Sequence, residues 1–452
     1  MNTDHAGHVM SEASAAGIEA FEQAAREFRC MVGDPAATIE HAIAECPQMP
    51  MAWVLKGWAY LLGTEPAGLP VARECARQAL NFAGTDRERA HAEAVHALGE
   101  GRWRESGRRL EDLSARWPLD ALALQAGHQV DFFCGDSRML RDRIARALPA
   151  WRPSMPAYHA LLGMYAFGLE ENGDYAQAER HGREAVEREP RDGWAWHAVA
   201  HVHEMRARPQ DGIEWLAPHA AKWSTGSFLA VHNWWHLALF HLERDDVDAV
   251  LRLFDGPIRG TESPVVLDLV DATAMLWRLH LRGVDVGDRW RTVADRWLPV
   301  ADAGLYAFND MHAMMAFVGA DRNDARAVVF DAQRAAKRGE GDNVDFVREV
   351  GEAATRAIAA FGDADYAQAV RLLRAVRSHA HRFGGSHAQR DVLDLTLIEA
   401  AIRGGDRPLA QALAAERAAR RPHGAPSLRF VERARRLPLP GADAVVEGLA
   451  AA

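Results

Sequence analysis

The stretch GDYAQAERHGREAVEREPRDGWAWHAVAHVHEM, residues 173–205, decides the fold. Gly173 and Asp174 form a turn that can open a helix, and small or apolar residues follow at helical spacing. Pro190 then breaks the chain, and a second run with helical spacing begins near Trp194. We therefore expect two antiparallel helices joined by a short turn that contains proline.

The same break recurs at a regular distance along the chain. Pro47, Pro118 and Pro190 each precede an amphipathic segment, and they lie 71 and 72 residues apart. Each gap fits two repeats of about 36 residues, close to the period of tetratricopeptide repeats. Strand signals are nearly absent, and Ala, Leu, Arg and Glu dominate. The sequence predicts an all-α, tetratricopeptide-like helical-repeat solenoid, which is a superhelix of antiparallel helix pairs.

The repeats also predict the domain organisation. We expect one repeat array over residues 21–435, because no Ser/Gly-rich linker interrupts it and stacked repeats share a continuous core. Residues 53–60 read W-x3-G-x2-Y, a large-small-large pattern that lets two helices approach closely. Residues 1–20 are expected to be a flexible N-terminal segment, and residues 436–452 a tail or short helix.

Composition excludes several classes of protein. The 452-residue chain has a formal net charge of −10 and no basic stripe, so we expect no nucleic-acid partner. No run of about 18 apolar residues is present, which predicts no membrane span. The N-terminus lacks the apolar core of a signal peptide. Few thiols indicate a reducing compartment and a cytoplasmic protein, since the four cysteines match no zinc or disulfide pattern: Cys30, Cys46, Cys75 and Cys134.

Polar side chains recur once per repeat in the helices that follow the proline turns. Successive members at 128, 159, 197, 232, 271 and 312 lie 31 to 41 residues apart, about one repeat each. Because one helix of each pair usually lines the concave, ligand-binding surface, these groups should form a line or converge there. The set includes His128, Asp131, His159, His197, His201, His203, Glu204, His232, Asn233, His236, Asp268, Asp271, Asn309, Asp310, His312, His387, Arg390 and Asp391.

Two H-x3-H pairs belong to this set, His197 with His201 and His232 with His236. Residues four apart differ by about 40° around a helix, so each pair points in one direction. Consecutive inner helices could therefore present four imidazoles to one point, as metal ligands for zinc, iron or manganese. The alternative is that each histidine packs at a helix interface and hydrogen-bonds to a carbonyl or carboxylate.

The same set supplies candidates for catalysis and substrate binding. Histidines His201 and His236, oriented by Asp268 or Asp271, suit general acid–base chemistry. With a metal bound, a water molecule would be the nucleophile. The tryptophans among the candidates have packing as their alternative role. We expect substrate binding by His128, Trp194, Glu204, Asn233, Trp234, Asn309, His312, Arg390 and Asp391, with Arg390 suited to an anionic group.

Several short motifs resemble one known family. They are W-A-W-H-A-V-A-H-V-H-E-M at 194–205, H-N-W-W-H at 232–236, F-N-D-x-H at 308–312 and G-G-S-x-A-Q-R-D at 384–391. Together they are similar to the tetratricopeptide repeat protein 38 family, over about residues 20 to 435. The resemblance implies tandem helical repeats and a shared site, but no named reaction.

Two functions remain open. The first is a small-molecule pocket, with hydrolase-type chemistry favoured over covalent acyl transfer because no nucleophilic Ser or Cys belongs to the polar set. The second is a scaffold that binds a protein partner without catalysis, a common use of such repeats. A tight coil would favour the pocket, and an open arc would favour the scaffold.

Overall fold

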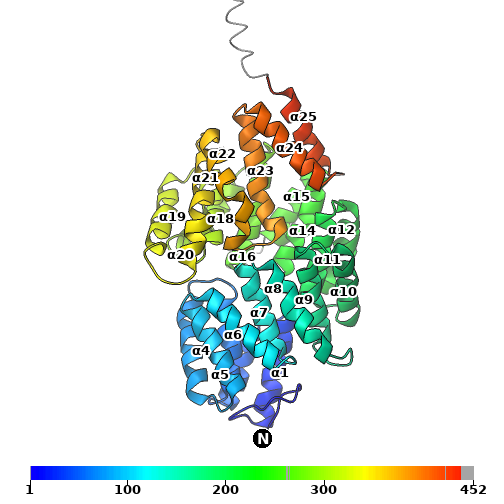
Figure 1. Cartoon of the computed structure of the whole chain (residues 1–452), viewed down its shortest axis with the longest axis vertical. Coiled ribbons are helices and arrows are strands. Elements are labelled where there is room, and N and C mark those ends of the chain that lie inside the picture. Colours follow the sequence, from blue (N-terminus) through cyan, green and yellow to red (C-terminus); the bar gives the residue numbers. More distant parts are fainter. Residues whose placement is uncertain (1, 261–262, 264, 423, 439–452) are drawn as a thin grey trace, which may run out of the picture.

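The computed structural model describes residues 2–260, 263, 265–422 and 424–438, and helices dominate this part of the chain (Figure 1). Two isolated β-bridges are its other regular pairings, so the all-α prediction is confirmed. The first helices are α1 (Ala15–Cys30), α2 (Pro35–Glu45), α3 (Pro50–Leu61), α4 (Gly68–Phe82), α5 (Asp86–Gly99), α6 (Trp103–Arg116), α7 (Ala121–Phe133), α8 (Ser137–Ala147), α9 (Tyr158–Glu171), α10 (Tyr175–Arg188), α11 (Gly193–Met205) and α12 (Pro209–Leu216).

The chain continues in the same manner to its C-terminal region. The remaining helices are α13 (Ala220–Ser224), α14 (Ala230–Glu243), α15 (Val247–Leu253), α16 (Val266–Leu281), α17 (Arg289–Trp297), α18 (Ala307–Gly319), α19 (Asn323–Ala336), α20 (Asn343–Phe346), α21 (Glu352–Gly362), α22 (Tyr366–Val376), α23 (His387–Arg403), α24 (Arg407–Arg420) and α25 (Ala425–Arg436). No helix of the described part is both long and apolar enough to cross a membrane.

The helices follow the predicted repeat. Helices α3, α5, α7, α9, α11, α14 and α16 begin 35 to 37 residues apart, and each packs against the helix that follows it. Many of the helices have an aspartate as the N-cap. Asp174 accepts a hydrogen bond from the Gln177 amide at α10, and Asp192 accepts one from the Ala195 amide at α11. Such N-caps satisfy amides that have no partner inside the helix. The chain is therefore a tetratricopeptide-like helical-repeat protein.

The superhelix coils tightly enough for distant repeats to touch. The Tyr306 hydroxyl donates to the Phe133 carbonyl at 2.9 Å, across 173 residues of sequence. Asn309 donates to the Thr64 hydroxyl at 3.0 Å. In Figure 1, α20 lies beside α6, and Arg104 indeed forms an ion pair with Asp345 at 2.8 Å. Within the described residues, these contacts join repeats that lie far apart in the sequence across the inside of the coil.

The ends of the chain extend this packing. Asp4 pairs with Arg87 at 3.3 Å, Met10 is buried, and the Ser11 amide donates to Glu88 at 2.8 Å. The N-terminal segment therefore packs on α5, unlike the flexible segment that we expected. Helix α25 continues to Arg436, and the expected tail lies mostly outside the described residues. The division into segments at residues 20 and 435 stays a prediction.

Close approach of helices at Gly57 gives a first prediction. A Cβ atom at Gly57 would lie 2.7 Å from Cγ1 of Val95, where α3 packs on α5. We expect Gly57→Leu to lower the free energy of unfolding by about 1–3 kcal/mol, because it overpacks this contact. Urea denaturation followed by circular dichroism measures the change. In Gly99→Ala, the matched control within α5, the new Cβ would meet only Cγ of Arg73, at 3.4 Å. Equal stability of the Gly57 variant and this control would contradict the prediction.

Candidate metal centre

Four histidines from two neighbouring helices meet inside the protein. Helix α11 carries His197 and His201, and α14 carries His232 and His236. One ring nitrogen of each lies within 4.8 Å of one from every other, so the group could hold a metal ion. The Nε2 atoms of His197 and His232 are 3.0 Å apart. The four-residue spacing places each pair on one helix face, and the packing of α11 on α14 joins the two faces.

Carboxylates from the surrounding helices engage the outer ring nitrogens. Asp271 on α16 lies 2.8 Å from Nδ1 of His232. Glu204 on α11 lies 3.1 Å from Nδ1 of His236. Glu170 on α9 approaches Nδ1 of His201 to 3.4 Å but forms no hydrogen bond with it. Metal-binding histidines usually make such outer contacts, which fix the ring orientation and leave the other nitrogen for the metal.

The inner nitrogens fit that role. Nε2 of His201 and Nε2 of His236 are buried without a hydrogen-bond partner in the described structure. Burial lowers the pKa of His197 and of His236 well below the usual value, and the neighbouring imidazoles lower both further. Burial lowers the pKa of His201 to about 4. All three rings are therefore neutral at pH 7, the protonation state that metal binding requires.

Two glutamates next to the cluster were missed in the sequence analysis. Glu170 and Glu171 end the apolar helix α9, and with His201 they form a second group that could hold a metal ion. Burial raises the pKa of Glu170 well above its usual value, and the charge of Glu171 raises it further. Burial opposes ionisation of Glu171 as well, but a hydrogen bond from His387 and the charge of Arg390 outweigh it and lower its pKa to about 2. The sequence signal that could have identified these glutamates is a pair of adjacent acidic residues at the end of an apolar helix.

Aromatic rings enclose the cluster on two sides. Phe167 stacks on His197 with ring centroids 5.2 Å apart, and Trp194 lies 4.8 Å from the same ring. Trp235 stacks on His232 at 5.4 Å. The ring of the predicted residue His128 lies next to these aromatic side chains, with centroids 5.7 Å from Trp194 and 5.9 Å from Phe167. These rings limit access to the four imidazoles and lower the local dielectric, which strengthens electrostatic interactions there.

Other predicted site residues lie away from the four histidines. The Asn233 side chain donates to the Gly193 carbonyl at 3.2 Å, and Trp234 packs on Trp223. Asn309 is bound to Thr64, and Nδ1 of His312 bonds to the Phe308 carbonyl at 2.8 Å. In the described structure these four side chains make no recorded contact with the cluster: Asn233, Trp234 and Asn309 join separate segments, and the His312 bond lies within α18.

Three further candidates lie near the cluster without joining it. Asp268 lies in the first turn of α16, and burial raises its pKa to about 7. Arg390 lies 3.6 Å from Glu171, and Asp391 forms a two-point ion pair with Arg417 at 2.7 and 2.9 Å. A cavity of about 530 Å³ is lined by Arg390 and Asp391, and one of about 370 Å³ by Glu204. The cavities thus flank the histidines, whereas we had expected the histidines to line one pocket.

Two solved structures are similar to this chain at low sequence identity. No protein-family model matches the chain, so the resemblance to the tetratricopeptide repeat protein 38 family stays a prediction. Yeast Tom70 is similar at 12% identity, covering 93% of this chain and 95% of that chain, with a TM-score of 0.34. An IFIT1 monomeric mutant solved with Gppp-AAAA is similar at 11% identity, covering 94% and 96%, with a TM-score of 0.40. This chain is recognised as a helical-repeat protein by its own pairs of packed helices. The two similar structures assign no activity to it.

The buried histidines predict acid sensitivity. Burial lowers the pKa of His128 to about 3, with a further contribution from Arg143. The unfolded chain takes up this proton below about pH 6.5, but the folded chain does not, so stability is complete above that pH and falls toward pH 3. We expect His128→Gln to reduce the loss by up to about 1.4 kcal/mol per pH unit, measured by urea denaturation at about pH 7, 6 and 5.

The exposed His41 provides the control for this experiment. His41→Gln should leave the pH dependence of unfolding as it is in the unchanged protein. If His128→Gln also retained the full loss of stability on acidification, His128 would not be the buried neutral group described above.

Proposed function

We propose that the chain is a metal-dependent protein that acts on a small molecule, with hydrolase-type chemistry. The observation that supports this most is the orientation of the rings. Three of the four histidines turn Nδ1 toward a carboxylate, and two buried Nε2 atoms in the group have no other partner. A metal ion would satisfy these two nitrogens together, each of which costs about 1–3 kcal/mol as an unsatisfied buried polar atom.

The ligand types narrow the choice of metal. His197, His201, His232 and His236 would hold zinc, iron or manganese, since neutral imidazole suits these ions and carboxylates stand nearby. Glu170 and Glu171 share His201 with the cluster, and they could add oxygen ligands for iron or manganese. The ion would supply Lewis-acid polarisation of a carbonyl or phosphoryl oxygen.

The acidic side chains around the four histidines would donate and accept protons. Glu170 and Glu171 are neighbours whose environments shift their pKa values in opposite directions, an arrangement typical of acid–base sites. The ring of His387 lies 3.0 Å from Glu171 and is 43% exposed, so it connects this pair with solvent. Asp271 holds the His232 ring in one tautomer, and Asp268 is suited to exchange protons near neutral pH. His201 and His236 act in this proposal as ligands, and the hydrogen bond between Glu204 and His236 fixes the orientation of the His236 ring.

The scaffold remains the alternative. Peptide-binding repeats need an accessible concave groove, whereas here the inner helices are packed together around the cluster. The exposed large apolar residues of the described part come from separate elements: Phe228, Leu298, Val328 and Leu428. This distribution favours a site inside the coil over a broad docking surface.

Metal content is the direct test of the proposed function. We expect protein purified without an affinity tag, or loaded with zinc, iron or manganese after chelation, to bind close to one equivalent by elemental analysis. The double variant His197→Ala/His236→Ala should lose it, because two of the four imidazoles are removed. His241→Ala changes a histidine of α14 that pairs with Asp246 outside the cluster, and should bind metal normally. Absence of metal from the unchanged protein under all loading conditions would contradict the proposal.

The outer carboxylates give a second, graded test. We expect Asp271→Asn to weaken metal binding by about 10- to 100-fold, because its carboxylate orients the His232 ring. A competition titration with a chromophoric chelator measures the change. Asp246→Asn is the matched control, since it alters a histidine–carboxylate pair at His241 that is remote from the four ligands. Equal metal affinity in Asp271→Asn and the unchanged protein would contradict the assignment.

A further inference from the structure

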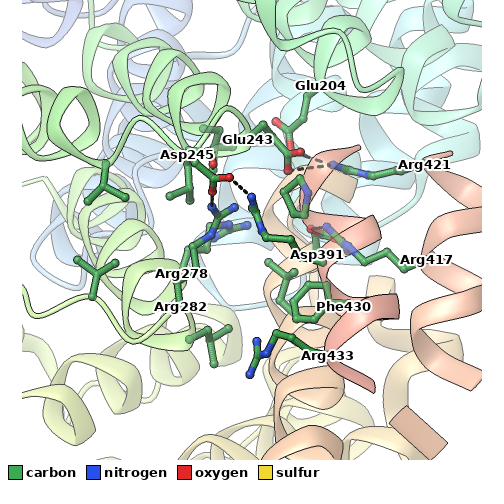
Figure 2. A pocket seen from close by; sticks show the side chains of 18 residues that line it. Glu204, Glu243, Asp245, Arg278, Arg282, Asp391, Arg417, Arg421, Phe430 and Arg433 are labelled. Atoms are coloured by element: carbon green, nitrogen blue, oxygen red, sulfur yellow. Dashed lines mark hydrogen bonds and ion pairs between the residues drawn. The ribbon is translucent and has the colours of Figure 1, made fainter. Parts of the chain in front are cut away.

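The cavity of about 370 Å³ beside Glu204 has an unusual lining. It lies among α14, α16, α23, α24 and α25 (Figure 2). Figure 2 shows Arg278 and Arg282 reaching in from one side and Arg417 and Arg421 from the other. The charged groups in the lining are Arg278, Arg282, Arg417, Arg421, Arg429 and Arg433, against Glu204, Glu243, Asp245 and Asp391.

Most of these arginines already have carboxylate partners. Arg417 is paired with Asp391, while Arg282 and Arg429 share Asp245. Outside the lining, Glu399 accepts two hydrogen bonds from Arg433, at 2.8 and 2.9 Å. These pairs account for four of the positive charges.

Arg278 is different. It is only 4% exposed, and its guanidinium donates to two backbone carbonyls, those of Ala274 at 3.1 Å and Ala388 at 2.8 Å. It forms no ion pair with any residue of the described part, although Trp235 lies under it at 5.1 Å. Buried charges in proteins are normally paired, because desolvation of an unpaired ion is costly.

Arg421 lines the same cavity and, among the described residues, also lacks a carboxylate within hydrogen-bond distance. It is 7% exposed, and its nearest carboxylates are Glu204 at 3.9 Å and Glu243 at 4.0 Å, beyond hydrogen-bond distance. Burial raises the pKa of Glu243, which weakens it further as a counter-ion. Two buried guanidinium groups thus face one cavity, and in the described part Arg278 has no ion pair while Arg421 has only long ones.

The rest of the lining is apolar. Its aliphatic and aromatic members are Leu239, Leu242, Val247, Leu281, Val284, Leu395, Pro426 and Phe430. Cavities of this size, with an apolar wall and a few charged groups, are typical of small-molecule sites. We infer that this cavity binds an organic anion, whose carboxylate or phosphate head lies at Arg278 and Arg421 and whose apolar body lies against Phe430 and the leucines.

The inferred site adjoins the histidine cluster. Glu204 lines the cavity and also contacts Nδ1 of His236. Trp235 separates Arg278 from the histidines, with its ring 5.0 Å from that of His236. The inference therefore deepens the proposed function by naming the class of ligand, and it rests on that function only for the role of the metal.

Calorimetric titration of the metal-free, full-length chain tests the inference. The probes are octanoate, octyl phosphate and octanol, which share an apolar chain and differ in the head group. We expect at least one anion to bind at least tenfold more tightly than octanol, because only a charged head pairs with the two guanidinium groups. The tighter anion identifies the head group as carboxylate or phosphate, and either result supports the inference.

Variants locate the binding. Arg278→Met and Arg421→Met should each weaken binding of that anion at least tenfold. Arg433→Gln, at an arginine already paired with Glu399, should change it less than threefold. Circular dichroism checks folding, and Arg421→Met carries the test if Arg278→Met does not fold. Octanol binding as tightly as both anions, or unchanged binding in the folded Met variants, would overturn the inference.

The same titration separates this site from the metal centre. His197→Ala/His236→Ala leaves the arginines in place, so anion binding should persist in that variant. Loss of metal with retained anion binding supports the two as distinct sites. Metal binding in a protein that binds neither anion would overturn the anion site and leave the metal centre standing.

Discussion

Helices α11 and α14 pack together through imidazole rings whose centroids lie 4.8 Å apart for His197 and His232 and 4.6 Å apart for His201 and His236. An apolar contact at this position would be stable without further support. Imidazoles bring ring nitrogens into the interior, and each one left without a partner costs free energy. Asp271 and Glu204 satisfy outer nitrogens, which leaves inner nitrogens directed at one another. The requirement to satisfy these nitrogens shapes the whole site.

The tight superhelix supplies the partners that local sequence cannot. The His387 amide donates to Glu171 at 2.8 Å across 216 residues, and Arg278 reaches the Ala388 carbonyl across 110 residues. Both contacts connect α23 with the helices around the cluster. An open solenoid would leave Glu171 and Arg278 facing solvent, with ordinary protonation and hydration. Closure of the coil therefore creates the buried, charged environment of the centre.

The sequence was a good guide to everything that repeats. Period, helix order and the shared faces of the H-x3-H pairs follow from spacing along one chain, and all appear in the structure. The spacing along the chain did not predict the contacts of Asn309 and His312, which bond to Thr64 and to the Phe308 carbonyl. The position of a residue within its repeat does not show which side chain from another repeat will lie next to it. The spacing also did not predict Glu170 and Arg278, which matter through contacts made by tertiary packing. Such partners depend on the pitch of the superhelix, which no local pattern encodes.

The charges around the centre are arranged so that its two proposed ligands assist each other. A divalent ion held by the four imidazoles would be stabilised by the ionised Glu171 and by Asp271 and Glu204, which contact the rings. The positive charge of Arg278 opposes the ion, just as it lowers the pKa of His236. An anion bound at Arg278 would offset that repulsion, and a bound metal ion would in turn attract the anion. By thermodynamic linkage each would raise the affinity for the other by the same factor. Arg278 would thus allow the proposed metal centre, enclosed by aromatic rings, to respond to an anion in the adjoining cavity.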